Sequence, residues 1–314
     1  MKTKTLLMKT KTLLMSRAAA LPPFMKTKTF LMSSAAALAL LISAAAFLSS
    51  GDSELCGSEF AQGAYESAFR YCEKACSQND GMSCNNLGRL YYNGDGVERD
   101  NQQAKTYYEK SCSLNDGSGC VNLGELYYNG DGVKRDDQQA KTYYEKSCNL
   151  NDSSGCRFLG VLYAEGRGVK RDNQQAKTYY EKACSLNDGM GCAYLGGFYR
   201  IVEQDYQQAK TYLEKSCSLN NGKGCVGLGM LYEEGSGVKQ DYTQAKTYYE
   251  KSCSLDDGIG CFGLGSLYYN GYGVKQNKKV SKEYCRKACD LGLQDGCSKA
   301  SRIMAELIVR GEDD

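Results

Sequence analysis

The sequence CNNLGRLYYNGDGVERDNQQAKTYYEKSC, residues 84–112, determines the fold, because variants of it follow one another along most of the chain. In its first half, Cys84, Leu87 and Leu90 are three residues apart, a spacing that places them on one face of an α-helix. The Gly-Asp-Gly stretch at residues 94–96 favours the end of that helix and a turn. We therefore expect a first helix, called helix A, that ends before this turn.

The second half of the unit predicts another helix, called helix B, over residues 100–112. Asp100 is a typical N-cap residue, and Ala104, Tyr108 and Cys112 follow at intervals of four. The next residues, LNDG at 114–117, include types that tolerate a left-handed backbone, so they predict a tight turn into the following helix A. Each unit is therefore a helical hairpin.

Seven pairs of cysteines mark the repetition of this unit. The members of each pair are eight residues apart, and the first members follow one another at steps of 36, 36, 36, 33, 36 and 36. Such a period is typical of solenoids built from paired helices. The sequence thus predicts an all-α fold, an α-solenoid of helix-turn-helix repeats, with one three-residue deletion near Arg200. The pairs are Cys76 and Cys84, Cys112 and Cys120, Cys148 and Cys156, Cys184 and Cys192, Cys217 and Cys225, Cys253 and Cys261, and Cys289 and Cys297.

These pairs predict disulfides, because each joins the end of one helix B to the start of the next helix A. Structural zinc sites usually have two to four residues between cysteines and often use histidine. Here seven residues intervene and the chain has no His, so we expect no metal and no other cofactor. Outside the pairs, we expect Cys56 to bond Cys72. Cys285 is then the odd thiol, either buried and free or linked to another molecule.

Residues 1–50 have the composition of a leader, with seven Lys or Arg and no Asp or Glu. A basic stretch at residues 25–28 precedes an apolar run at residues 35–46, as in a secretory signal peptide. We expect cleavage between Ala46 and Gly51, a working start at Met25, and a secreted or periplasmic location. An uncleaved anchor and a lipoprotein are open alternatives, although the run is shorter than the ~20 residues of a stable membrane span.

Four segments are expected: a leader at 1–50, an N-terminal half-repeat cap at 51–80, six repeats at 81–293, and a capping helix with a tail at 294–314. Without residues 1–50, 39 − 7 = 32 basic residues face 37 acidic ones, a formal charge of −5. Phosphate neutralisation by Lys and Arg supplies most of the affinity for nucleic acid. We therefore expect no nucleic-acid partner.

The repeat resembles the Sel-1-like repeat, a relative of the tetratricopeptide repeat. The resemblance rests on LGELYYNGDGV at residues 123–133, QAK at 139–141 and YEKSC at 144–148. With the corner cysteines added, the chain is similar to the secreted cysteine-rich Sel-1-like proteins of Helicobacter. The resemblance implies a right-handed superhelix outside the cytoplasm and an adaptor-like role in contact with a host. Several members also carry a penicillin-binding or β-lactamase label, which makes a β-lactam or cell-wall fragment an alternative ligand.

The residues give little support to that enzymatic label. Serine β-lactamases need Ser-x-x-Lys together with Ser-Asp-Asn and Lys-Thr-Gly. Ser236 and Lys239 match the first pattern, but they lie in an A-to-B turn, and the other two motifs are absent. The lack of His also removes Ser-His-Asp and Cys-His nucleophiles. We expect no catalytic residues, and a structural envelope protein is a third alternative.

Helix A carries the most variable positions, whereas helix B barely changes between repeats. The first, fifth and eighth residues after the helix A cysteine form one stripe by helical spacing. Aromatic residues and Arg are enriched in interfaces, so we expect this stripe to bind a peptide or protein partner on the concave side, although drift at exposed positions would give the same variation. The candidate residues are Asn85, Arg89, Tyr92, Glu125, Tyr128, Arg157, Arg200, Met230, Phe262 and Tyr269.

Overall fold

The computed structural model describes residues 51–310, which contain α-helices, one π-helical turn and no β-strand. Residues 51–61 are helical and precede α3. The A helices are α4 (Gly81–Asn93), α6 (Gly117–Asn129), α8 (Ser153–Glu165), α10 (Gly189–Phe198), α12 (Gly222–Glu234) and α14 (Gly258–Asn270). The B helices are α3 (Tyr65–Ser77), α5 (Asn101–Ser113), α7 (Asp137–Asn149), α9 (Asn173–Ser185), α11 (Tyr206–Ser218), α13 (Tyr242–Ser254) and α15 (Lys278–Asp290), and α16 (Gln294–Arg310) follows. The predicted all-α solenoid is confirmed.

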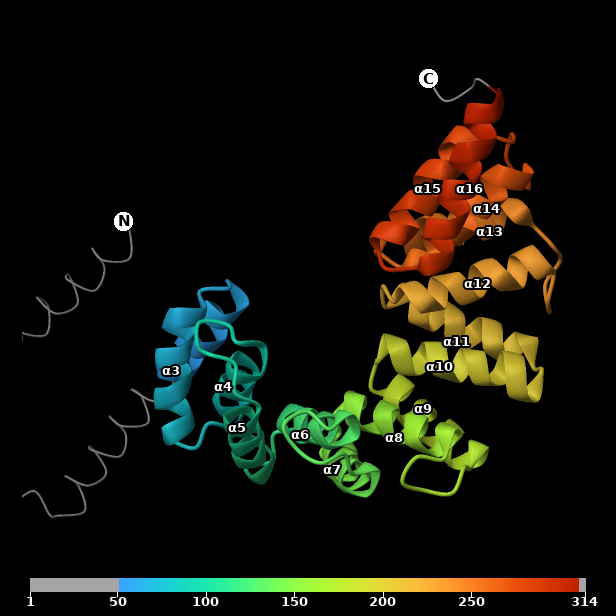
Figure 1. Ribbon diagram of the computed structural model, residues 1–314. Helices are drawn as coiled ribbons and strands as arrows, with labels where there is room; N and C mark the ends of the chain where they lie inside the picture. Colours follow the sequence, from blue (N-terminus) through green and yellow to red (C-terminus); the bar gives the residue numbers. More distant parts are fainter. Residues whose placement is uncertain (1–50, 311–314) are drawn as a thin grey trace, which may run out of the picture. The chain divides into compact units, whose positions relative to one another are not determined.

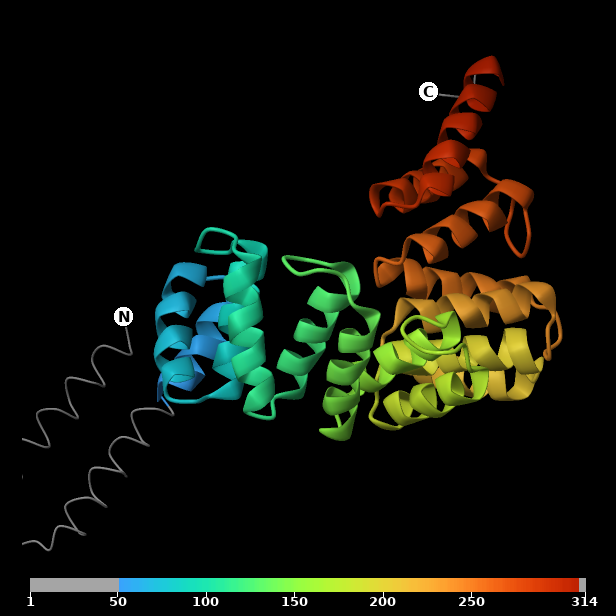
Figure 2. The same cartoon turned by 60° about the horizontal axis from the view of Figure 1, so that its bottom comes forward.

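The helices stack in chain order, each packed against the one before it and the one after it (Figures 1 and 2). Consecutive A helices also contact one another, from α4 with α6 to α14 with α16. No two consecutive B helices in the described part of the chain make comparable contact. The A helices therefore pack more closely together than the B helices, and we call the side of the stack that they form the inner surface.

Side-chain caps and left-handed residues set the helix ends where the sequence predicts them. The Asp100 carboxylate accepts hydrogen bonds from the backbone N–H groups of Gln102 and Gln103, at 2.8 and 3.0 Å. Gly94 ends α4 with φ 80°, a conformation that costs glycine little. Asn115, in the turn from α5 to α6, also has a positive φ, 63°. The same cap and turn recur in most of the other repeats.

Eight disulfides stabilise the stack, and all sixteen cysteines pair as predicted. Seven bridges join the end of a B helix to the start of the next A helix, with Cα atoms 4.5 to 4.7 Å apart. The eighth is the predicted bridge between Cys56 and Cys72. Cys285 is free and buried against Ile303 and Leu307 of α16, which favours the buried thiol over an intermolecular link.

A lysine from the next B helix also contacts most of these corners. Lys146 of α7 donates a hydrogen bond from Nζ to the backbone oxygen of Cys112, at 2.6 Å. This oxygen lies in the last turn of α5, where a helix carries partial negative charge that a cation stabilises. Equivalent bonds join Lys110 to Cys76, Lys182 to Cys148, Lys215 to Cys184 and Lys287 to Cys253.

The glycine in the middle of each A helix allows a large side chain of helix B to pack against the backbone. A Cβ atom on Gly88 would lie 2.6 Å from the ring of Tyr108, and one on Gly124 would lie 2.5 Å from the ring of Tyr144. Both distances are too short for real carbon contacts, so a side chain at either glycine would displace the tyrosine ring.

The three-residue deletion changes the connection between α10 and α11. Here the A helix continues into a π-helical turn, Tyr199–Glu203, and Gln204 then takes a left-handed conformation with φ 54°. Asp205 follows directly and caps α11. The Gly-x-Gly turn of the other repeats is thereby replaced, and Ile201 and Val202 are exposed on the surface.

The leader, its cleavage position and the working start all fall in residues 1–50, outside the described residues, as does the tail at 311–314. Between residues 51 and 310, no helix has both the length and the apolar character needed to cross a membrane.

Candidate partner-binding surface

The ten stripe residues lie on the A helices with different degrees of exposure. Arg89 is exposed, Asn85 is buried, and the other eight are half-buried. The Asn85 Oδ1 atom accepts a hydrogen bond from Asn122 of the next repeat at 2.7 Å. A buried residue with this contact is structural, so the prediction that Asn85 contacts a partner directly finds no support in its burial.

The three stripe tyrosines bridge neighbouring repeats. The Tyr92 hydroxyl donates to the carboxylate of Asp131 at 2.8 Å. In the same way Tyr128 donates to Glu165 at 3.3 Å, and Tyr269 donates to Glu306 at 2.9 Å. These bonds span 37 to 39 residues, about one repeat. These three tyrosines are therefore held by contacts between repeats.

The stripe arginines are also held in place by neighbours. The Arg157 guanidinium donates to Asp188 at 3.1 Å and lies 4.3 Å above the ring of Phe158. Arg89 lies 4.5 Å above the ring of Phe60. Both side chains are thus oriented before any ligand arrives, which lowers the entropic cost of binding.

Two cavities open on the inner surface, and they occupy equivalent places four repeats apart. We call them the first and the second inner cavity, with volumes of about 200 and 360 Å³. The lining of the first includes Arg89, Tyr92, Tyr108, Asn122 and Glu125. The lining of the second includes Met230, Glu233, Tyr249, Phe262 and Gly263.

Five of the ten predicted residues line these cavities: Arg89, Tyr92, Glu125, Met230 and Phe262. The other five, Asn85, Tyr128, Arg157, Arg200 and Tyr269, line neither cavity. Cations surround the ring of Tyr269, since Lys299 and Lys278 lie 4.2 and 5.1 Å from its centre.

Burial raises the pKa of the Glu125 carboxyl, and the positive charge of Arg157 only partly opposes this shift. Because this pKa is higher in the folded than in the unfolded state, the protonated carboxyl favours folding. That contribution to stability is lost as the pH rises through the folded-state pKa, and the ionised carboxylate is buried at a cost at pH 7. We therefore expect Glu125→Gln to raise the melting temperature at pH 7, with a gain that shrinks towards pH 4. A lower melting temperature at pH 7, or a difference independent of pH, would contradict this assignment.

The second residue after each helix A cysteine is a site that the stripe analysis missed. Phe158 stacks on Tyr144 of the preceding B helix with ring centres 5.0 Å apart, and Tyr194 stacks on Tyr180 at 5.3 Å. The sequence did contain a signal, because this position varies strongly between repeats. It is occupied by Asn86, Asn122, Phe158, Tyr194, Gly227 and Gly263.

Arg167 is a second residue that the sequence analysis missed, because it lies in an A-to-B turn treated only as a connector. Its guanidinium lies 3.4 Å from the ring centre of Tyr128, one repeat earlier, and donates to Asp137 at 3.0 Å. Burial opposes ionisation of Asp137, but the hydrogen bonds and positive charges of Arg135 and Arg167 together hold the pKa of its carboxyl below the usual range.

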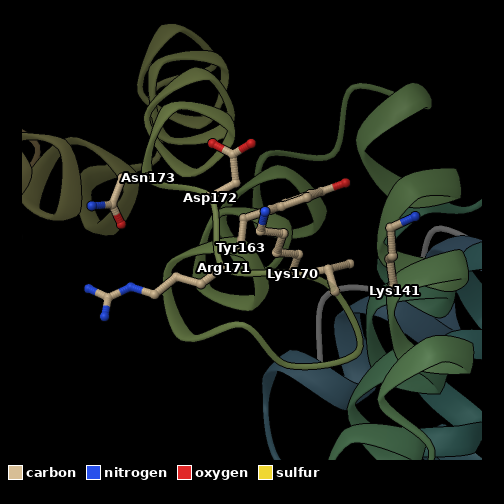
Figure 3. Close-up of a pocket in the computed structure, with 7 residues that line it drawn as sticks. Lys141, Tyr163, Lys170, Arg171, Asp172 and Asn173 are labelled. Atoms are coloured by element: carbon tan, nitrogen blue, oxygen red, sulfur yellow. The ribbon is translucent and has the colours of Figure 1, made fainter.

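A second row of cavities lies along the A-to-B turns and is built from nearly invariant residues. One cavity of about 670 Å³ is formed by Lys141 of α7 and by Tyr163 and Lys170 of the next repeat. Figure 3 shows Tyr163 extending towards Lys141, while Arg171 points away. Equivalent cavities recur at two other repeats. Because these residues repeat almost unchanged, they belong to the scaffold that all units share.

Six stacked tyrosine pairs also belong to this scaffold, one in each repeat between helix A and helix B. Their ring centres are 5.4 to 5.8 Å apart. The pairs are Tyr91 and Tyr107, Tyr127 and Tyr143, Tyr163 and Tyr179, Tyr199 and Tyr212, Tyr232 and Tyr248, and Tyr268 and Tyr284.

The environment of Ser236 differs from that of an activated nucleophile. Its hydroxyl donates to the carboxylate of Glu234 at 3.1 Å, and Lys239 is exposed. Within the described residues, no group of three or more Cys, Asp or Glu side chains is placed to hold a metal ion.

Two solved structures, a Sel1 repeat protein and a protective antigen, support the fold. A Sel1 repeat protein from Oxalobacter formigenes is 27% identical, with 76% of this chain and 98% of that chain covered, and a TM-score of 0.69. A protective antigen present in uropathogenic Escherichia coli strains is 25% identical with a TM-score of 0.59, and the match covers 80% of this chain but only 57% of the antigen. Cysteine-rich protein B of Helicobacter pylori is 38% identical over 41% of this chain and 92% of its own length, with a TM-score of 0.35. No curated protein matches the sequence.

The model of the Sel1 repeat family matches the chain seven times, and its segments include residues 51–80 as well as the six units that follow. The matched segments are 51–80, 81–116, 117–152, 153–188, 189–221, 222–257 and 258–293. Together they cover most of the chain, and the predicted resemblance is confirmed. The chain belongs to the Sel1 repeat family.

Proposed function

We propose that the protein is a secreted or periplasmic adaptor that binds a peptide or protein segment along its inner surface. The observation that carries this proposal is that each repeat combines constant structural residues with variable residues on its inner side. Caps, corner disulfides and tyrosine pairs are nearly the same in every unit, whereas side chains that differ between units gather around the two inner cavities. A scaffold with a constant frame and a variable inner side suits recognition of one extended ligand.

The chemistry of the inner surface supports binding of a polypeptide. Arg89 and Tyr92 line the first inner cavity, and Met230 and Phe262 line the second. Aromatic residues, Met and Arg are the types enriched in protein interfaces. The proposed ligand therefore contacts both polar and apolar sites along the A helices.

Eight disulfides favour an oxidising compartment, since cytoplasmic thiols are kept reduced. This agrees with the leader expected in residues 1–50. We also propose a role in binding rather than catalysis, since the Ser236 hydroxyl bonds Glu234 and not a lysine that would serve as its base.

Alanine substitutions on the inner surface test the proposal. Peptides are selected from a displayed random library on the oxidised protein and then titrated against two variants. One variant has Ala at Arg89, Tyr92 and Tyr128, and the other has Ala at Met230 and Phe262. Loss of central interface side chains typically costs ~2 kcal/mol, so we expect at least one variant to bind the peptides roughly thirtyfold more weakly.

The matched control carries Ala at Thr106, Thr142 and Thr178, which are exposed on the B helices. Circular dichroism shows whether each variant keeps its helices, because Tyr92 and Tyr128 also bond neighbouring repeats. Selection of no peptide, or equal binding to both inner-surface variants and the control, would contradict the proposal.

A further inference from the structure

Two repeats fill the space above a helix B tyrosine with an aromatic side chain of their own. Phe158 lies over Tyr144 with an angle of 15° between the rings, and Tyr194 lies over Tyr180 with an angle of 29°. Both pairs are close to parallel and have ring centres within 5.3 Å. Near-parallel contacts at this separation are favourable arrangements for two aromatic rings.

The second inner cavity lies beside the equivalent helix B tyrosine, where the residue above the ring has no side chain. The equivalent tyrosine is Tyr249, and the residue above it is Gly263. A Cβ atom on Gly263 would lie 2.9 Å from the Tyr249 ring, so the ring packs against this glycine and would have to shift slightly to admit a side chain there. The cavity has a volume of about 360 Å³, and its lining also includes the apolar side chains of Met230, Ile259 and Phe262. This volume falls in the range of ordinary ligand pockets.

The rim of this cavity is acidic. Glu233 and Glu234 both line it, and its lining contains no Lys or Arg. The Glu233 carboxylate accepts a hydrogen bond from the Tyr249 hydroxyl at 2.6 Å, which fixes its position beside the ring. Arg200 approaches Glu234 at 3.5 Å from outside the lining, and the Glu234 side chain is 49% exposed. A cation on a ligand would therefore meet negative charge next to an apolar pocket.

We infer that the second inner cavity binds an aromatic side chain of a peptide, stacked on Tyr249, with a Lys or Arg of that peptide beside Glu233 and Glu234. The ligand ring takes the place that Phe158 and Tyr194 occupy in their own repeats. This inference rests on the proposed function and names the chemistry that one part of the inner surface recognises.

Short acetylated and amidated peptides test the inference by calorimetric or NMR titration of the oxidised protein. We expect Gly-Tyr-Arg-Gly to bind, and both Gly-Ala-Arg-Gly and Gly-Tyr-Glu-Gly to bind at least about tenfold more weakly. Gly263→Phe, with a small shift of the Tyr249 ring to make room for the new Cβ, places the protein's own ring in the cavity and should abolish binding of the first peptide. The control Thr106→Phe adds a ring on the exposed side of a B helix and should leave that binding unchanged.

A variant that keeps the cavity open tests the charge separately. Replacement of both Glu233 and Glu234 by Gln should remove the preference for Arg over Glu in the peptide while the preference for Tyr over Ala is retained. Equal binding of the Tyr and Ala peptides to the wild type, or unchanged binding to Gly263→Phe, would overturn the inference. Some library peptides could lose binding when Met230 and Phe262 are replaced but keep it in Gly263→Phe. That result would contradict only the assignment of this cavity and would leave the proposed function intact.

Discussion

Replacement of both Cys148 and Cys156 by Ala is expected to lower the free energy of unfolding by about 2.5 kcal/mol. A disulfide stabilises a protein mainly because it restricts the unfolded chain, and the size of the effect depends on the length of the closed loop. Here the two cysteines are 8 residues apart. In a solenoid, each repeat is stabilised mainly by its neighbours. Loss of one bridge should therefore destabilise the two repeats that it joins more than it destabilises the repeats at the ends of the stack.

Urea unfolding followed by circular dichroism measures this effect, and hydrogen exchange of the backbone amides localises it. The matched control is the same pair of substitutions at Cys253 and Cys261, where the bridge has the same separation. We expect a similar loss there, with increased exchange around α13 and α14 instead of α7 and α8. An unchanged urea midpoint in both variants would show that the corner bridges do not stabilise the fold.

Tyr144→Ala is expected to lower the free energy of unfolding by about 4 kcal/mol, because removal of a buried aromatic side chain leaves a large cavity. Tyr144 is fully buried, packs against Gly124 and carries the stacked ring of Phe158. Its hydroxyl oxygen is buried and has no hydrogen-bond partner within the described part of the chain. Tyr144→Phe should therefore cause no loss of stability.

The two Tyr144 variants are compared by chemical denaturation under the same conditions. A large loss in Tyr144→Ala and none in Tyr144→Phe would assign the stabilisation to the ring. A loss of more than about 1 kcal/mol in Tyr144→Phe would instead mean that the hydroxyl is hydrogen-bonded.

The repetition in the sequence made most of the fold predictable. Residues that recur every 36 positions fix the helix faces, the Asp caps and the cysteine corners, and a single unit such as residues 84–112 specifies them all. The bridge between Cys56 and Cys72 was predicted as a link that holds the N-terminal cap, and the structure contains it.

The inner surface was only partly predictable, because its contacts join residues about one repeat apart. The bond of Tyr92 to Asp131 and the contact of Arg167 with Tyr128 depend on the rotation between successive hairpins. Helical spacing within one unit carries no information on that rotation. It identified the stripe but could not show that a cavity lies beside Gly263 and the ring of Tyr249.

The most direct test of a disulfide-stabilised, exported scaffold is the intact mass of the native protein after its free thiols are alkylated in denaturant, with and without prior reduction. Eight bridges remove sixteen hydrogens and leave Cys285 as the single alkylated cysteine. We expect that mass, with an N-terminus between Phe47 and Gly51. Seventeen alkylated cysteines without reduction, on a chain that retains residues 1–50, would contradict both the stabilised scaffold and its export.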